Sequence, residues 1–100
     1  MNFDRIGANA CRELISGSNP TIIDIRDAQS FSQGHIESAL HIEEINLEDF
    51  VETEDKAKPL VIYCYHGNSS LSAAGWFSQK GFENVYSLDG GYEDWVATRD

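Results

Sequence analysis

Short apolar runs, each followed by a stretch of helical character, constrain the fold of this chain most. The segments 21–25 (TIIDI) and 60–64 (LVIYC) are mostly apolar or β-branched, and 39–42 and 84–88 are predicted as further short strands. A strand with one face in water alternates apolar and polar residues, whereas a strand buried on both faces is apolar along its length. The central runs therefore predict an α/β fold with a parallel sheet covered on both faces.

The segments between these strands have helical periodicity and end at turn residues. In the segment before the first run, apolar side chains recur at helical spacing, at Ala8, Cys11, Leu14 and Ile15. Further helices are predicted at 27–33, 46–55, 70–80 and 92–97. Because no linker or repeat divides the chain, residues 1–100 are expected to form one domain around a central parallel sheet of about five strands.

Charge and composition exclude several classes of partner. Lys and Arg number 7 against 17 acidic residues, which gives a net charge of −10. Such a charge argues against nucleic acid and anionic membrane surfaces as partners. No apolar run is long enough to span a membrane, and the first ten residues (MNFDRIGANA) lack the apolar core of a secretory signal. We therefore expect a reducing, cytoplasmic setting in which Cys11 and Cys64 are free thiols.

Three chemically suggestive stretches follow predicted strands. They are 24–27 (DIRD), 64–70 (CYHGNSS) and 89–91 (DGG). In an open parallel sheet, ligands bind at the carboxyl ends of the strands. These stretches are therefore predicted to converge at one edge of the sheet.

The stretch CYHGNSS places a thiol between a strand and a helix. If the backbone curls around the sulfur of Cys64, the following N–H groups form an anion-binding nest, and the helix adds its positive end. Gly67 and Asn68 tolerate left-handed backbone conformations, while Ser69 and Ser70 are good N-caps. A thiol in such a ring is stabilised as the nucleophilic thiolate. The local sequence is equally compatible with an ordinary strand–helix connection in which the cysteine only packs.

Counting excludes two other kinds of site. A cysteine-dependent phosphatase has an arginine six positions after its nucleophile to clamp the phosphate, and here that position is Ser70. A zinc site needs three or four ligands, yet only His66 lies near Cys64, while His35 and His41 are distant. The chain also has no glycine-rich nucleotide motif. We therefore expect no metal and no cofactor.

Three blocks together resemble the rhodanese (sulfurtransferase) domain family across nearly the whole chain. They are Asp24 to Ala39, which resembles the D-x-R…F-x-x-G-H-I-x-x-A signature, the strand VIYC with its loop, and Val85 to Trp95, which fits V-x-x-L-x-G-G-x-x-x-W. Many members have arginines at the second and sixth loop positions, where this chain has Tyr65 and Ser69. The arginine-free loop is similar to that of single-domain bacterial GlpE-type thiosulfate sulfurtransferases.

This resemblance implies a ping-pong reaction. Cys64 would attack the outer sulfur of thiosulfate, release sulfite and keep a persulfide. A thiophilic acceptor such as cyanide or a dithiol, including that of thioredoxin, would then take the sulfur. The loop residues that would bind the substrate are Tyr65, His66, Gly67, Asn68, Ser69 and Ser70.

The remaining polar residues have two interpretations each. Asp24 and Arg26 either support the loop from the neighbouring strand end or form only a local ion pair. Tyr65 and His66 either frame the substrate entrance or are merely exposed. Two alternative functions also stay open: a persulfide relay to a protein dithiol, and a non-catalytic rhodanese-type regulatory module.

Overall fold

The computed structural model describes residues 3–99 and contains one sheet of five parallel strands. The strand order is β1-β5-β4-β2-β3, so the sequence prediction of a parallel α/β sheet is confirmed. The strands are β1 (Phe3–Ile6), β2 (Thr21–Asp24), β3 (Leu40–His41), β4 (Leu60–Tyr63) and β5 (Val85–Leu88). β2 and β4, the two apolar runs, are buried at every position, as the absence of alternation predicted.

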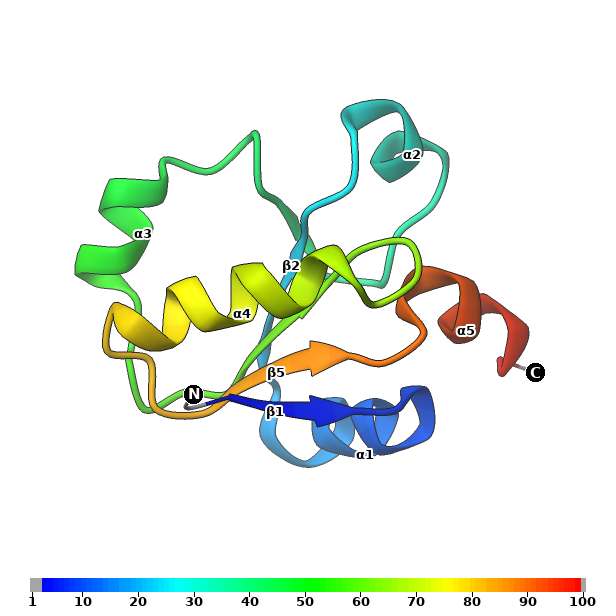
Figure 1. Cartoon of the computed structure of the whole chain (residues 1–100), viewed down its shortest axis with the longest axis horizontal. Helices are drawn as coiled ribbons and strands as arrows, with labels where there is room; N and C mark the ends of the chain where they lie inside the picture. Colours follow the sequence, from blue (N-terminus) through cyan, green and yellow to red (C-terminus); the bar gives the residue numbers. More distant parts are fainter. Residues whose placement is uncertain (1–2, 100) are drawn as a thin grey trace.

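Helices connect the strands and cover both faces of the sheet (Figure 1). They are α1 (Ala8–Ser18), α2 (Ala28–Gln33), α3 (Leu47–Thr53), α4 (Ser69–Gln79) and α5 (Gly91–Ala97). One core cluster joins the sheet to apolar side chains of α1, α2 and α5, and includes Cys11, Phe31 and Trp95. The second joins the opposite face to α3 and α4, through residues such as Phe50 and Phe77. The prediction of a doubly covered sheet is therefore confirmed.

The strand β1 is the element that hydrophobic patterning did not identify. Its sequence is FDRI, with exposed Asp4 and Arg5 between half-buried Phe3 and Ile6. It lies at the edge of the sheet and pairs in parallel with β5 alone. An edge strand this short buries little apolar surface. Its position is determined by backbone pairing with β5, which leaves no hydrophobic pattern in the sequence.

The start of α4 also differs from the prediction. The N-cap is Asn68, whose side chain makes no capping hydrogen bond, and the helix begins at Ser69. The prediction that Ser69 and Ser70 act as N-caps is therefore wrong. The physical reason is that Ser70 lies inside the first turn, where its hydroxyl points to buried side chains rather than to a free backbone N–H.

The topology produces a switch point between β2 and β4. These strands are neighbours, with Asp24 in register with Tyr63. From β2 the chain continues towards β3 at one edge of the sheet, and from β4 it continues towards β5 on the other side. The two connections therefore diverge, which is the arrangement that opens a crevice at the carboxyl ends of parallel strands. Cys64 is the first residue after β4 and lies at this point.

Within residues 3–99, none of the helices combines the length and the apolar character needed to cross a lipid bilayer.

Candidate active site

The sulfur of Cys64 lies at the centre of the loop between β4 and α4. The side chain is buried, with the residue only 5% exposed. The backbone N–H of Gly67 donates to Sγ over 3.2 Å, and that of Ser70 donates over 3.3 Å. For these two residues the predicted inward orientation of the N–H groups is confirmed.

Gly67 provides the backbone conformation that turns the loop inward. Its φ of +95° is in the left-handed region, whereas Asn68 has a φ of −88°. The prediction of a left-handed residue is thus confirmed at Gly67 and wrong at Asn68. Gly67 also lies tightly packed, because a Cβ there would lie 2.8 Å from the backbone nitrogen of Gly90. A side chain at this position would push the N–H donor away from the sulfur.

A third contact to the sulfur comes from the hydroxyl of Ser70. Its Oγ lies 3.4 Å from Sγ and accepts from the thiol. The same oxygen lies 2.8 Å from Oγ of Ser87 on β5. Ser70 and Ser87 are both fully buried. The polar atoms behind the sulfur are therefore hydroxyls and backbone amides rather than charged side chains.

These contacts make Cys64 unusually acidic for a buried thiol. Burial raises the pKa of the thiol, because a thiolate is poorly solvated there. Hydrogen bonds from the Ser70 hydroxyl and from the N–H groups of Ser70, Gly67 and His66 stabilise the thiolate and outweigh burial, so that the pKa lies below its ordinary value. The thiolate is the nucleophilic form of cysteine. The geometry therefore favours a reactive sulfur.

The first turn of α5 holds the loop from outside. The N–H of Tyr92 donates to the carbonyl of Cys64 over 2.9 Å, and that of Glu93 donates to the carbonyl of Tyr65 over 3.1 Å. With these carbonyls directed outward, the N–H groups of the loop are free to point inward. Gly91 allows the approach, since a Cβ there would lie 2.5 Å from both carbonyl oxygens. The first turn of α5 is thus a clamp on the loop, and the stretch 89–91 lies against the loop, as its predicted convergence requires.

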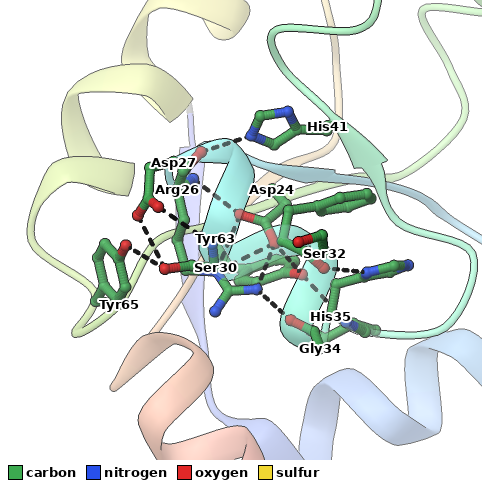
Figure 2. A network of polar contacts seen from close by, with 12 residues as sticks. Asp24, Arg26, Asp27, Ser30, Ser32, Gly34, His35, His41, Tyr63 and Tyr65 are labelled. Atoms are coloured by element: carbon green, nitrogen blue, oxygen red, sulfur yellow. Dashed lines mark hydrogen bonds and ion pairs between the residues drawn. The ribbon is translucent and has the colours of Figure 1, made fainter.

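Asp24 and Arg26 form a buried ion pair beside the loop (Figure 2). Arg26 Nη2 lies 2.8 Å from Oδ2 of Asp24, and the hydroxyl of Tyr63 donates to the same oxygen over 2.6 Å. The N–H of Ile36 in turn donates to the Tyr63 hydroxyl over 3.1 Å. A buried charge pair is tolerated when such extra hydrogen bonds satisfy it. This network ties the ends of β2 and β4 to the segment after α2.

Arg26 connects this pair to the surrounding elements. Its Nη2 donates to the carbonyl of Gly34 over 2.6 Å, and its guanidinium lies 4.1 Å from the ring centroid of Tyr92 on α5. The carbonyl of Arg26 lies 2.6 Å from Nε2 of His41. Neither Asp24 nor Arg26 makes a hydrogen bond to Sγ of Cys64 in the described part of the chain. Their geometry matches support of the neighbouring strand end.

Tyr65 and His66 point away from the sulfur. Tyr65 is 41% exposed, and its hydroxyl lies 2.6 Å from Oγ of Ser30 on α2, as Figure 2 shows. His66 is exposed, with Nδ1 3.3 Å from a carboxylate oxygen of Glu93. Both side chains therefore lie on the outer surface of the loop. Among the remaining predicted site residues, Asn68 and Ser69 are also exposed.

No cluster of three or more potential metal ligands occurs among residues 3–99. Cys11 is the second free thiol. It lies on α1, far from the loop in sequence, and packs into the hydrophobic core. His35 stacks on Phe31 with ring centroids 3.8 Å apart, and its Nδ1 lies 2.7 Å from the Phe31 carbonyl.

Sequence reasoning missed the residues that act on the loop from a distance. Ser87 reads as one polar residue in a short strand. The approach of Gly90 and Gly91 to the loop agrees with the predicted convergence of 89–91, but the hold of Tyr92 and Glu93 on the loop was not predicted. The signal for Ser87 is that a polar residue stands in a strand next to apolar neighbours. Its partner, however, becomes visible only when β5 and the start of α4 are placed together.

Comparison with known proteins places this chain in a family. The rhodanese-like domain family matches residues 8–98, and the chain belongs to that family. The thiosulfate sulfurtransferase GlpE of Pseudomonas aeruginosa strain LESB58 is 50% identical over 93 residues, which cover 93% of this chain and 84% of that protein. GlpE of Ectopseudomonas mendocina is 48% identical over 96 residues, which cover 96% of this chain and 87% of that protein.

Solved structures have the same fold. The rhodanese-like domain of an Anabaena protein superposes with a TM-score of 0.79 at 25% identity, over 93% of this chain and 73% of that chain. The human single-domain sulfurtransferase superposes with a TM-score of 0.80 over 96% of this chain and 97% of its own, at 18% identity. The second likeness concerns the fold alone.

Proposed function

We propose that this protein is a thiosulfate sulfurtransferase with Cys64 as its nucleophile. The observation that carries the proposal is the set of polar groups around the Cys64 sulfur: two backbone N–H groups donate to it, and the Ser70 hydroxyl contacts it and can donate to the thiolate. The names of the relatives at about half identity support thiosulfate as the donor.

In the first half-reaction, the Cys64 thiolate attacks the outer sulfur of thiosulfate. A new S–S bond forms on Cys64, the S–S bond of thiosulfate breaks, and sulfite leaves with its electron pair. The enzyme is left as a persulfide whose negative charge lies on the outer sulfur. Donors arranged before the reaction stabilise such charge without reorganising during it.

In the second half-reaction, a thiophilic acceptor attacks the outer sulfur and Cys64 leaves as the thiolate. Cyanide would give thiocyanate, and a thiol would give a persulfide. A second thiol can attack the inner sulfur of that persulfide to form a disulfide, and the outer sulfur then leaves as hydrosulfide. The lowering of the Cys64 pKa by its hydrogen bonds favours this step too, because a more acidic thiol is a better leaving group. A protein dithiol such as that of thioredoxin fits as an acceptor, and a reducing compartment suits the two free cysteines.

The charge of the chain explains why the anion site is built from the backbone. A net charge of −10 repels thiosulfate at long range. Backbone N–H groups and hydroxyls bind an anion locally without the desolvation of a buried cation. The loop residues Tyr65, His66, Gly67, Asn68, Ser69 and Ser70 form the proposed substrate site. Asp24 at the end of β2 and Arg26 just after it support this site.

The test is the formation of thiocyanate from thiosulfate and cyanide. We expect turnover by the wild-type protein and none by Cys64→Ser, because a hydroxyl cannot accept and pass on the sulfur at neutral pH. Cys11→Ala is the matched control and should keep its activity, since Cys11 lies in the core away from the loop. Turnover by Cys64→Ser at the wild-type rate would refute the proposal.

Intact mass after thiosulfate treatment separates the enzyme from a regulatory module. We expect the mass of one sulfur atom to appear on Cys64 and to disappear when cyanide is added. A protein that folds but gains no sulfur would support the non-catalytic interpretation. Comparing turnover with a reduced thioredoxin-type dithiol and with cyanide at equal concentration then tests the relay to a protein.

A further inference from the structure

Ser87 lies one step behind the reactive sulfur and has no part in the reaction described so far. Its Oγ is 2.8 Å from Oγ of Ser70, and that oxygen is 3.4 Å from Sγ of Cys64. The two serines are fully buried, and Cys64 is nearly so. Buried hydroxyls are almost always hydrogen-bonded. These three side chains therefore form a chain of hydrogen bonds from β4 through α4 to β5.

The direction of this chain depends on the ionisation of Cys64. In the thiol form, S–H donates to the Ser70 oxygen, and either hydroxyl of the Ser70–Ser87 pair can be the donor to the other. A thiolate has no hydrogen and only accepts. If the Ser70 hydroxyl then donates its single hydrogen to the sulfur and keeps its 2.8 Å contact with Ser87, only the Ser87 hydroxyl can be the donor in that contact.

We propose that Ser87 is a positioning residue that holds the Ser70 hydroxyl as a hydrogen-bond donor to the Cys64 thiolate. Consecutive hydrogen bonds polarise one another, so a donor to the Ser70 oxygen strengthens the bond from Ser70 to the sulfur. The importance of this for turnover rests on the proposed function, in which the thiolate attacks in the first step and leaves in the second. In the persulfide the charge is on the outer sulfur, so the chain favours the free thiolate.

Other ionisable groups near the loop do not replace this chain. Helix α4 has no ionisable side chain between Ser69 and Gln79. The charged groups on the other surrounding elements pair with one another: Asp24 with Arg26, Asp89 with Arg5, and His66 with Glu93. The remaining ionisable side chains of β4, β5, the loop and α5 make no hydrogen bond to Sγ within residues 3–99: Tyr63, Tyr65, Tyr86, Tyr92 and Asp94.

The test is the pH dependence of Cys64 alkylation by iodoacetamide, followed on the Cys64 peptide by mass spectrometry. Ser87→Ala should move the midpoint upward by about half a pH unit, as expected for the loss of part of a hydrogen bond. The rate on the high-pH plateau should stay unchanged. Ser87→Thr keeps a hydroxyl on a strand residue and should restore the wild-type midpoint.

A double-mutant cycle identifies the route of the effect. If Ser87 acts through Ser70, Ser87→Ala should cause no further shift in a Ser70→Ala protein. A further shift in that background would overturn the proposal, as would an equal loss of rate at every pH with the midpoint unchanged. Ser87→Cys fills similar space with a weaker donor, and an unchanged midpoint in that variant also overturns it.

Alkylation needs no thiosulfate, so the two proposals fail separately. A protein that forms no thiocyanate but shows the predicted shift refutes the sulfurtransferase and leaves the role of Ser87 standing. Normal thiocyanate formation with an unshifted midpoint refutes the role of Ser87 and leaves the sulfurtransferase proposal standing.

Discussion

The two cysteines of this protein are both buried, and they differ in almost everything else. Cys11, a residue of α1, is fully buried in the core, and burial raises its pKa to about 11. Cys64 is 5% exposed, and hydrogen bonds lower its pKa in spite of burial. The difference lies in the neighbours of each sulfur, apolar side chains for Cys11 and inward N–H and O–H groups for Cys64. Burial alone therefore says little about the reactivity of a thiol.

Alkylation of both thiols in the folded protein tests this difference in reactivity directly. Because the two pKa values lie on opposite sides of the ordinary 9.0, Cys64 should react at least about 100-fold faster than Cys11 near neutral pH. Peptide mapping after brief iodoacetamide treatment measures the ratio. In denaturant the ratio should fall to near unity, and a small ratio in the folded protein would remove the basis of the comparison.

The Cys11 side of the comparison predicts a loss of stability at high pH. In the unfolded chain this thiol ionises near 9.0, whereas in the folded protein it stays protonated up to about 11. Its contribution to stability is fully present below about pH 9 and is lost as the pH rises towards about 11, by about 2 kcal/mol. Denaturant unfolding across this window measures it. Cys11→Ala is the control and should have a shallower decline; equal slopes would contradict the prediction.

The Cys64 side of the comparison depends on Gly67. Gly67→Ala places a Cβ 2.8 Å from the backbone nitrogen of Gly90, at a φ of +95°. The N–H donor must then move from the sulfur, and losing one hydrogen bond to a thiolate should slow alkylation of Cys64 about tenfold at neutral pH. Gly81→Ala is the matched control, because Gly81 also has a positive φ but open space around it. Equal rates in the two variants would show that backbone strain, not the donor, is responsible.

The smallest effect is expected from the charged pair outside the loop. His66 and Glu93 are both exposed, with 3.3 Å between their polar atoms. If backbone donors set the reactivity of Cys64, Glu93→Gln should change the alkylation rate by less than about twofold, since exposed ion pairs contribute little. A larger change, abolished by added salt, would mean that side-chain charge contributes after all.

Much of the fold was predictable because burial leaves a pattern in the sequence. The apolar runs of β2 and β4 identified a doubly covered parallel sheet, and the position of Cys64 directly after one run predicted that it lies at the carboxyl edge of that sheet. β1 was not predictable in the same way, because FDRI has only two apolar residues and depends on pairing with β5.

For the site, residue types predicted the centre but not its support. A cysteine followed by Gly67 and Ser70 indicates an inward loop, because these residues act locally. Ser87 acts on the loop from a distant part of the sequence, and no neighbouring residue in the chain indicates that it contacts Ser70. The proximity of Gly91 was predicted, but its close approach to the loop carbonyls was not. The mistaken assignment of Ser70 as an N-cap has the same origin, since its hydroxyl serves a tertiary contact.

The clamp from α5 has a consequence for the order in which the protein becomes competent. During synthesis Cys64 leaves the ribosome before Ser87 and before the amides of Tyr92 and Glu93 that hold its loop. Until those residues emerge, the thiol lacks this support and should behave as an ordinary cysteine, mostly protonated and slow to oxidise. The environment of the Cys64 sulfur is therefore complete only after residues up to Glu93 have emerged.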